Sequence, residues 1–232
     1  MTMLKTNENG RSMIEMLGVL AIIGVLSVGG IAGYSKAMNK FKTNKVADQV
    51  SMIVANVKTL YAQQNTYHGL DNKTAVEMGV IPDELGKVGA SAAATVLKNP
   101  YNGLVFIKAA GSTTSTDEKA FVINYNGLSR EACITLATND WGSGFSSGLI
   151  AISAKGTSVA ANATAAATDL DAVVIGNAGT AAAAAANTTA DGGSAIATPG
   201  GTNLAVPMSV SSAATACGCT HGNNCSVTWK YY

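Results

Sequence analysis

The sequence is poor in charged, aromatic and histidine residues. Asp, Glu, Lys and Arg make up 12% of its 232 residues, and the formal net charge is +1. Soluble domains usually carry about 25% charged residues. Because no strongly basic face is present, we expect no nucleic-acid partner. Aromatic residues make up only 6% of the chain, so a globular core must be built mainly from Val, Ile, Leu and Ala.

The scarcity of histidine argues against catalysis. His68 and His221 are the only two, and neither stands in a Ser/His/Asp pattern. No glycine-rich loop lies between a strand and a helix, as a phosphate-binding site would need. We therefore predict that the chain is not an enzyme and binds no cofactor.

A long apolar run lies near the N-terminus. Residues 16–33 contain no charged side chain, and Glu15 stands at the edge of this run. A helix of this length covers about 27 Å, close to the ~30 Å hydrocarbon core of a bilayer. A secretory signal would have a shorter run and a cleavage site after it. We therefore predict a membrane-spanning helix, in which Glu15 is costly unless it has a partner.

The N-terminus resembles that of a prepilin. Gly10-Arg11-Ser12-Met13-Ile14-Glu15 follows a short polar leader and runs directly into the apolar segment. In prepilins, a peptidase cuts after the glycine, and the glutamate five residues into the mature chain pairs with the new N-terminus of a neighbouring subunit. The resemblance implies cleavage between Gly10 and Arg11 and an assembly role for Glu15. Arg11 departs from the apolar residue, N-methylated after cleavage, that the family more often carries there.

An amphipathic pattern follows the apolar run. Nothing between Ser35 and Gln64 breaks a helical pattern, so both segments predict one helix of about 50 residues and about 75 Å. Such a helix resembles the long N-terminal helix of type IV pilins. Apolar residues recur at spacings of three and four, which places them on one helix face: Val46, Val50, Ile53, Val54, Val57, Leu60 and Tyr61.

The remaining residues, 65–232, predict an α+β head with antiparallel strands. Residues 153–216 are dominated by Ala, Thr, Ser, Gly and Asn, and such a tract buries little apolar area to offset its ordering entropy. We predict surface loops and short edge strands there, with only 170–175 and 204–206 strand-like. Elsewhere we predict strands at 104–107, 120–125 and 226–232, and helices at 74–78, capped by Thr74, and 130–138, capped by Ser129.

The four cysteines are Cys133, Cys217, Cys219 and Cys225. In an exported chain an even number fits disulfide bonding. Cys217 and Cys219 are too close in sequence for an easy bridge to each other, which favours Cys133 with one of them and Cys225 with the other. A zinc site formed by Cys217, Cys219, His221 and Cys225 is the alternative. It would leave Cys133 unpaired, and export favours oxidation, so we predict disulfides and no metal.

A second block of the chain resembles type IVb pilins of the PilS-like subgroup. Gly127-Leu128-Ser129 ends a predicted strand, and Glu131-Ala132-Cys133 follows on a helix. In that subgroup the helix cysteine begins a disulfide-bounded loop. The resemblance therefore implies a bridge from Cys133 to the C-terminal cysteines. Closing a loop of about 90 residues is worth about 4 kcal/mol in the chain-entropy model.

Together these features predict a type IVb-like pilus subunit with the type IV pilin fold, in which a long N-terminal helix packs on an antiparallel sheet. The precursor would sit in the bacterial inner membrane, be cut by prepilin peptidase, and be built by the pilus assembly machinery into an extracellular homopolymer. Packing of Met13–Lys36 helices would form the filament core. The predicted parts are a leader (1–10), an assembly helix (11–34), an amphipathic half (35–64) and a head (65–232) with a disulfide-bounded region (133–225).

Two other functions remain open. A minor pilin or a type II secretion pseudopilin uses the same kind of anchor. A membrane-anchored binding domain that never polymerises would also need an apolar helix. The head of a pilus subunit would supply adhesion, aggregation or conjugative contact.

Overall fold

The computed structural model describes residues 13–88, 96–114, 116–142, 147–156, 170, 194–199, 205–219 and 224–232. It divides into two compact units, with the boundary between Phe41 and Lys42. Gly10, Arg11 and His221 lie outside the described residues.

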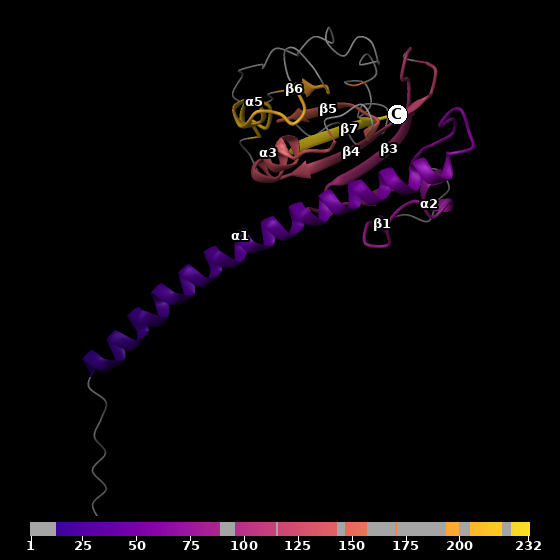
Figure 1. Ribbon diagram of the computed structural model, residues 1–232. Helices are drawn as coiled ribbons and strands as arrows, with labels where there is room; N and C mark the ends of the chain where they lie inside the picture. The colour runs from indigo at the N-terminus through magenta and orange to yellow at the C-terminus, as the bar shows by residue number, and fades with distance from the viewer. Residues whose placement is uncertain are drawn as a thin grey trace, which may run out of the picture. The chain divides into compact units, whose positions relative to one another are not determined.

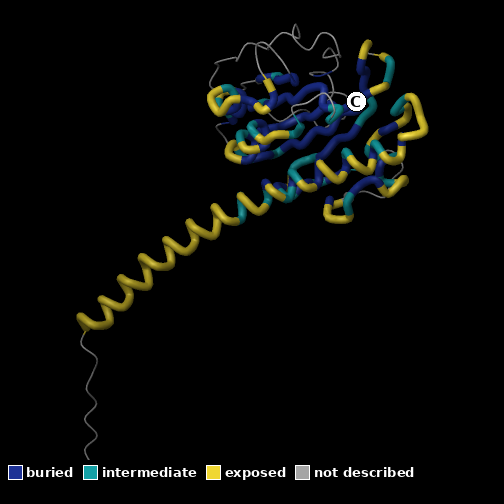
Figure 2. Tube along the Cα trace, in the orientation of Figure 1, coloured by how far each residue is buried: buried dark blue, intermediate teal, exposed yellow. Residues whose placement is uncertain are grey.

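Helix α1 (Met13–Leu60) contributes to both units. Its side chains are exposed from Met13 to Ala37, and Figure 2 shows this half in yellow along its whole length. After Lys42 one face is buried, which confirms most of the predicted stripe: Val46, Val50, Ile53, Val57 and Tyr61 are at most 5% exposed. The assignment of Leu60 to the stripe was wrong, because its side chain is 40% exposed. The helix also ends at Leu60 rather than at Gln64.

The sheet of the second unit has seven strands in the order β1-β2-β3-β4-β7-β5-β6, and every pair of neighbours is antiparallel. The predicted α+β class is therefore confirmed. The C-terminal strand lies between β4 and β5, in the interior of the sheet (Figure 1). The strands are β1 (Gly86–Val88), β2 (Val96–Lys98), β3 (Leu104–Ala110), β4 (Ala120–Leu128), β5 (Leu149–Lys155), β6 (Ser194–Ala197) and β7 (Cys225–Tyr231).

Three shorter helices accompany the sheet in the described residues: α2 (Asn72–Glu77), α3 (Arg130–Thr138) and α5 (Val210–Ala216). The side chain of Ser129 accepts a hydrogen bond from the Ala132 backbone N–H, as predicted for the N-cap of α3. The prediction of Thr74 as the cap of α2 was wrong. The carboxylate of Asp71 accepts the hydrogen bond, and the Thr74 backbone N–H donates it over 2.7 Å.

The Ala/Thr/Ser-rich tract contains a short edge strand, as predicted, and a helix that was not predicted. Strand β6 and helix α5 fall inside it, and β5 overlaps its start. Of the segments 170–175 and 204–206, only Leu170, Ala205 and Val206 lie within the described residues. Ala205 forms an isolated parallel bridge with Thr198.

The two faces of the sheet carry separate cores. Successive residues of a strand point to opposite faces, so Phe121 and Ile123 of β4 face one way and Val122 faces the other. The larger cluster joins the first face to α1, α3 and α5. The smaller cluster, which includes Val122, Ile150 and Leu170, lies on the second face.

A tight turn between β2 and β3 depends on Gly103. The Asn99 side chain accepts the Gly103 backbone N–H and donates to the Asn126 backbone carbonyl over 2.7 Å. These bonds hold the turn directly against the end of β4. A Cβ atom added at Gly103 would overlap that Asn126 carbonyl, so only glycine fits there.

We expect Gly103→Ala to destabilise the head by about 2 kcal/mol or more, because backbone rather than a flexible side chain must move. The measurement is the free energy of unfolding from denaturant titration. Gly86→Ala is the matched control, since its Cβ would lie 3.5 Å from the Lys98 Cβ in an ordinary contact. Equal stability of the two variants would contradict the role given to Gly103.

Candidate assembly helix and disulfide-bonded region

The first half of α1 is the candidate assembly site. Among the described residues, α1 is the one helix that is long and apolar enough to cross a membrane, with a mean hydropathy of 2.2 over its most apolar window and no buried residue in that window. Glu15 lies in the first turn. The unpaired backbone N–H groups of a helix N-terminus favour a negative charge there. This half therefore presents an uncovered apolar surface with one carboxylate at its start.

Polar contacts fix the second half of α1 to the head. The Thr43 hydroxyl lies 2.8 Å from the Tyr101 hydroxyl, and the Lys42 ammonium lies 5.5 Å from the centre of the Tyr101 ring. Lys45 pairs with Glu84 over 3.1 Å. Exposed ion pairs contribute little, so these contacts set the position of the helix more than they stabilise it.

Further along α1, Lys58 and Gln49 meet the sheet. The Lys58 ammonium donates a hydrogen bond to the Ser147 carbonyl over 2.9 Å and lies 5.4 Å from the centre of the Tyr231 ring. Partial burial lowers the pKa of Lys58, and deeper burial raises the pKa of Tyr231. The Tyr125 hydroxyl donates to the Gln49 side chain over 3.4 Å, and burial raises the pKa of Tyr125. The hydroxyl groups of Tyr125 and Tyr231 therefore stay protonated near neutral pH.

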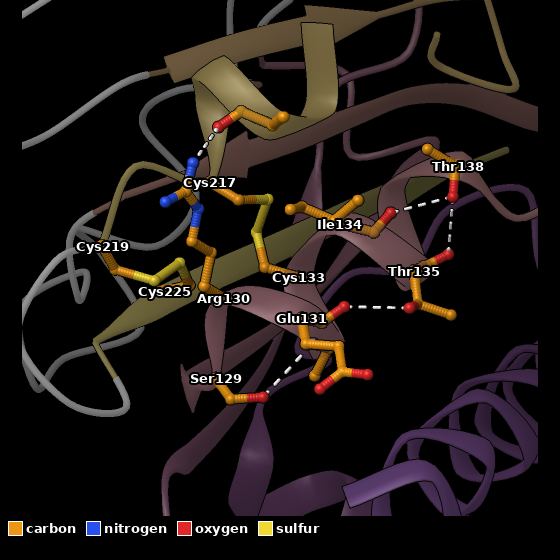
Figure 3. The surroundings of a disulfide bond; sticks show 12 residues. Ser129, Arg130, Glu131, Cys133, Ile134, Thr135, Thr138, Cys217, Cys219 and Cys225 are labelled. Atoms are coloured by element: carbon orange, nitrogen blue, oxygen red, sulfur yellow. Dashed lines mark hydrogen bonds between the residues drawn. A yellow bond between two sulfur atoms is a disulfide. The ribbon is translucent and has the colours of Figure 1, made fainter. Parts of the chain in front are cut away.

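The four cysteines lie together at one end of the sheet. Cys133 on α3 is bonded to Cys217, and Cys219 is bonded to Cys225 (Figure 3). The Cα atoms are 5.9 Å and 5.5 Å apart, within the usual range. Because all four are paired in disulfides, none offers the thiolate that the zinc alternative required.

Secondary structure explains why these cysteines meet. Cys225 opens β7 and pairs with Leu128 at the end of β4. Only Ser129 separates Leu128 from α3, so Cys133 follows one turn into that helix. Cys217 is the C-cap of α5, and its backbone N–H donates to Ala213. Three rigid elements thus converge on the two bridges.

Helix α5 was missed from the sequence, and it positions Cys217. Two hydrogen bonds join α5 and the residues before it to α3. The Met208 backbone N–H donates to Ala137 over 3.2 Å, and the Arg130 guanidinium donates to Ala214 over 3.4 Å. Ser209 caps the helix. The sequence feature that could have predicted α5 is Ser209 followed by small residues at helical spacing. Two of these, Ala213 and Ala216, are buried.

Comparison with known proteins identifies the family. The sequence model of the Bundlin family matches residues 35–193, about two thirds of the chain. The chain belongs to the Bundlin family. The Bundlin match covers the second half of α1, the β3–β4 hairpin and α3.

Relatives of this Bundlin chain agree with that assignment. Toxin coregulated pilin of Vibrio cholerae serotype O1 is 29% identical over 138 residues, 58% of this chain and 59% of that protein. The major structural subunit of bundle-forming pilus of Escherichia coli O127:H6 is 26% identical over 60% of this chain and 68% of that protein. The chain thus spans about three fifths of the length of toxin coregulated pilin.

Two solved pilin structures align with most of this Bundlin chain. TcpA, a type IV pilin from Vibrio cholerae El Tor biotype, covers 82% of this chain and 99% of its own, with a TM-score of 0.48 and 21% identity. Type IV b pilin from Salmonella typhi covers 78% of this chain and 93% of its own, with a TM-score of 0.44 and 13% identity.

The two bridges are expected to differ in their effect on stability. In the chain-entropy model, the 84-residue separation of Cys133 and Cys217 is worth about 4.6 kcal/mol, and the separation of 6 between Cys219 and Cys225 about 2.2 kcal/mol. We therefore expect the double variant C133A/C217A to lose about 2 kcal/mol more than C219A/C225A. Denaturant unfolding of the head measures both losses. A greater loss in C219A/C225A would contradict this order.

Proposed function

We propose that this chain is the structural subunit of a type IVb-like pilus that polymerises through the first half of α1 into a surface filament. The observation that carries the proposal is the exposure of that half: 13 of its large apolar side chains, from Met13 to Tyr34, are 49% or more exposed. A monomer in water rarely leaves such a patch uncovered. Lipid covers it in the precursor, and neighbouring helices cover it in the filament.

The relatives support this function. One of them is a toxin coregulated pilin, and another is the major structural subunit of bundle-forming pilus. The match to the Bundlin family begins at residue 35, after the apolar run, and extends well into the head, so the likeness does not rest on the apolar segment. The major role is favoured over that of a minor pilin or pseudopilin because one relative is itself the major structural subunit of a pilus.

Glu15 would set the register of the filament. A carboxylate buried in an apolar helix without a partner is costly, by roughly 2.5 to 3.5 kcal/mol at the helix centre on insertion scales. The α-amine of Arg11, created on a neighbouring subunit by cleavage after Gly10, would neutralise it. Only subunits staggered so that the two charges meet avoid this cost. Glu15 therefore acts in assembly rather than in catalysis.

The partners follow from this life cycle. The precursor enters the bacterial inner membrane through α1, prepilin peptidase removes residues 1–10, and the pilus assembly machinery moves the subunit into an extracellular filament. The head then faces outward. There it mediates adhesion, aggregation or conjugative contact.

We expect Glu15→Gln to reduce surface filaments by tenfold or more while the chain accumulates in the membrane, because the amide cannot neutralise the incoming amine. Shearing of filaments from cells followed by immunoblotting of both fractions measures this. Glu131→Gln is the matched control, since Glu131 is also an exposed acid in the first turn of a helix. It should leave filaments at the level of the unmodified chain.

Mass spectrometry of the sheared filaments completes the test. The expected subunit begins at Arg11 and contains two disulfides. A chain that still begins at Met1, or one absent from the filaments, would rule out the proposal. Equal filament yields for Glu15→Gln and Glu131→Gln would rule out the assembly role of Glu15 alone.

A further inference from the structure

The two disulfides form one group of sulfur atoms rather than two separate bridges. The Sγ atoms of Cys133, Cys217 and Cys225 all lie within 4.8 Å of one another. Two of them form the long bridge, and the third belongs to the short one. Cys219 is not among the three mutual neighbours. Figure 3 shows both bridges side by side at the start of α3.

This neighbourhood is built into rigid elements. Cys225 is held by the β4–β7 ladder, Cys133 by α3, and Cys217 by the last turn of α5. All three are completely buried. The elements that carry these cysteines therefore hold the three sulfur atoms close together.

We propose that Cys225 is the exchange thiol of the head, which passes disulfide pairing between the C-terminal cysteines and Cys133. When the short bridge is open, the Cys225 thiolate attacks the Sγ of Cys133. The Cys133–Cys225 bond forms, the Cys133–Cys217 bond breaks, and Cys217 leaves as a thiolate that takes up a proton. One disulfide is consumed and one is made, so this step needs no oxidant or reductant.

Opening the short bridge is the only step of this scheme that needs an external thiol. Two molecules of a monothiol, or one dithiol, supply two electrons and two protons, which convert the Cys219–Cys225 disulfide to two thiols. Cys219 is the less deeply buried end, since it is 6% exposed and the other three cysteines are 0% exposed. External thiols thus enter at Cys219, and the long bridge responds through Cys225.

The same route serves the maturing chain. Cys133 is separated from the C-terminal cysteines by more than eighty residues, whereas Cys219 and Cys225 are six apart. Whether Cys217 or Cys225 captures Cys133 first, the other sulfur lies in position to exchange with it. Final oxidation of Cys219 and Cys225 by an external disulfide removes the thiolate beside the long bridge and ends the exchange.

The structure predicts a difference between two single variants of the full chain, each lacking one member of the short bridge. Cys219→Ala leaves Cys225 as a free thiol beside the long bridge. Cys225→Ala leaves Cys219 free, outside the group of mutual neighbours. Both variants lose the same short bridge, so they are matched in that loss. Each would be purified in detergent, incubated at pH 8.5, quenched with acid and N-ethylmaleimide, and mapped by mass spectrometry without reduction.

We expect Cys219→Ala to contain a Cys133–Cys225 bridge in a fraction at least tenfold above that of any rearranged bridge in Cys225→Ala. Cys225→Ala should retain Cys133–Cys217. Rearrangement to the same extent in both variants, or in neither, would overturn the proposal. Neither result depends on filament formation, so this test is independent of the proposed function.

A second measurement covers the case in which a single variant fails to fold. Under graded glutathione, the long bridge of the unmodified chain should open only after the short one. It should then open at least tenfold faster than the long bridge of the double variant C219A/C225A, which has no thiol at position 225. Equal rates would refute exchange through Cys225.

Discussion

The packing of the buried stripe of α1 against the sheet is the constraint on which the rest of the head depends. Val50, Ile53 and Val57 are completely buried and belong to one core with Tyr125 and Trp229. Each such side chain contributes about 1.5–3 kcal/mol when buried. Without this contact the inner face of the sheet would be open to water. With it, the second half of α1 covers that face and closes the core of the head.

The two halves of helix α1 have different patterns of apolar residues. Its first half has apolar residues on all sides, as a helix surrounded by lipid or by other helices requires. Its second half has one apolar face, as a helix on a sheet requires. The change between the two patterns falls where the chain divides into its two compact units, after Phe41. Helix α1 carries both patterns without interruption from Met13 to Leu60.

Covalent bonds compensate for a weak part of the core. Helix α5 is made of Val, Ser, Ala and Thr, so it buries little apolar area, although Ala213 and Ala216 are completely buried. The Cys133–Cys217 bridge and the hydrogen bonds from Met208 and Arg130 hold this region to α3. A region with little apolar surface can be kept in place by constraining the unfolded chain instead. The sulfur atoms lie close together because α5 is held against α3 in this way.

Local patterns were sufficient for much of this protein. The apolar run, the stripe of α1, the cap at Ser129 and the strands around 104–107, 120–125 and 226–232 follow from spacing and side-chain type, which act over a few residues. Local patterns did not predict the position of β7 inside the sheet, the packing of α5 beside α3, or the grouping of Cys133, Cys217 and Cys225. They depend on contacts between segments about a hundred residues apart, which only the packed sheet brings together.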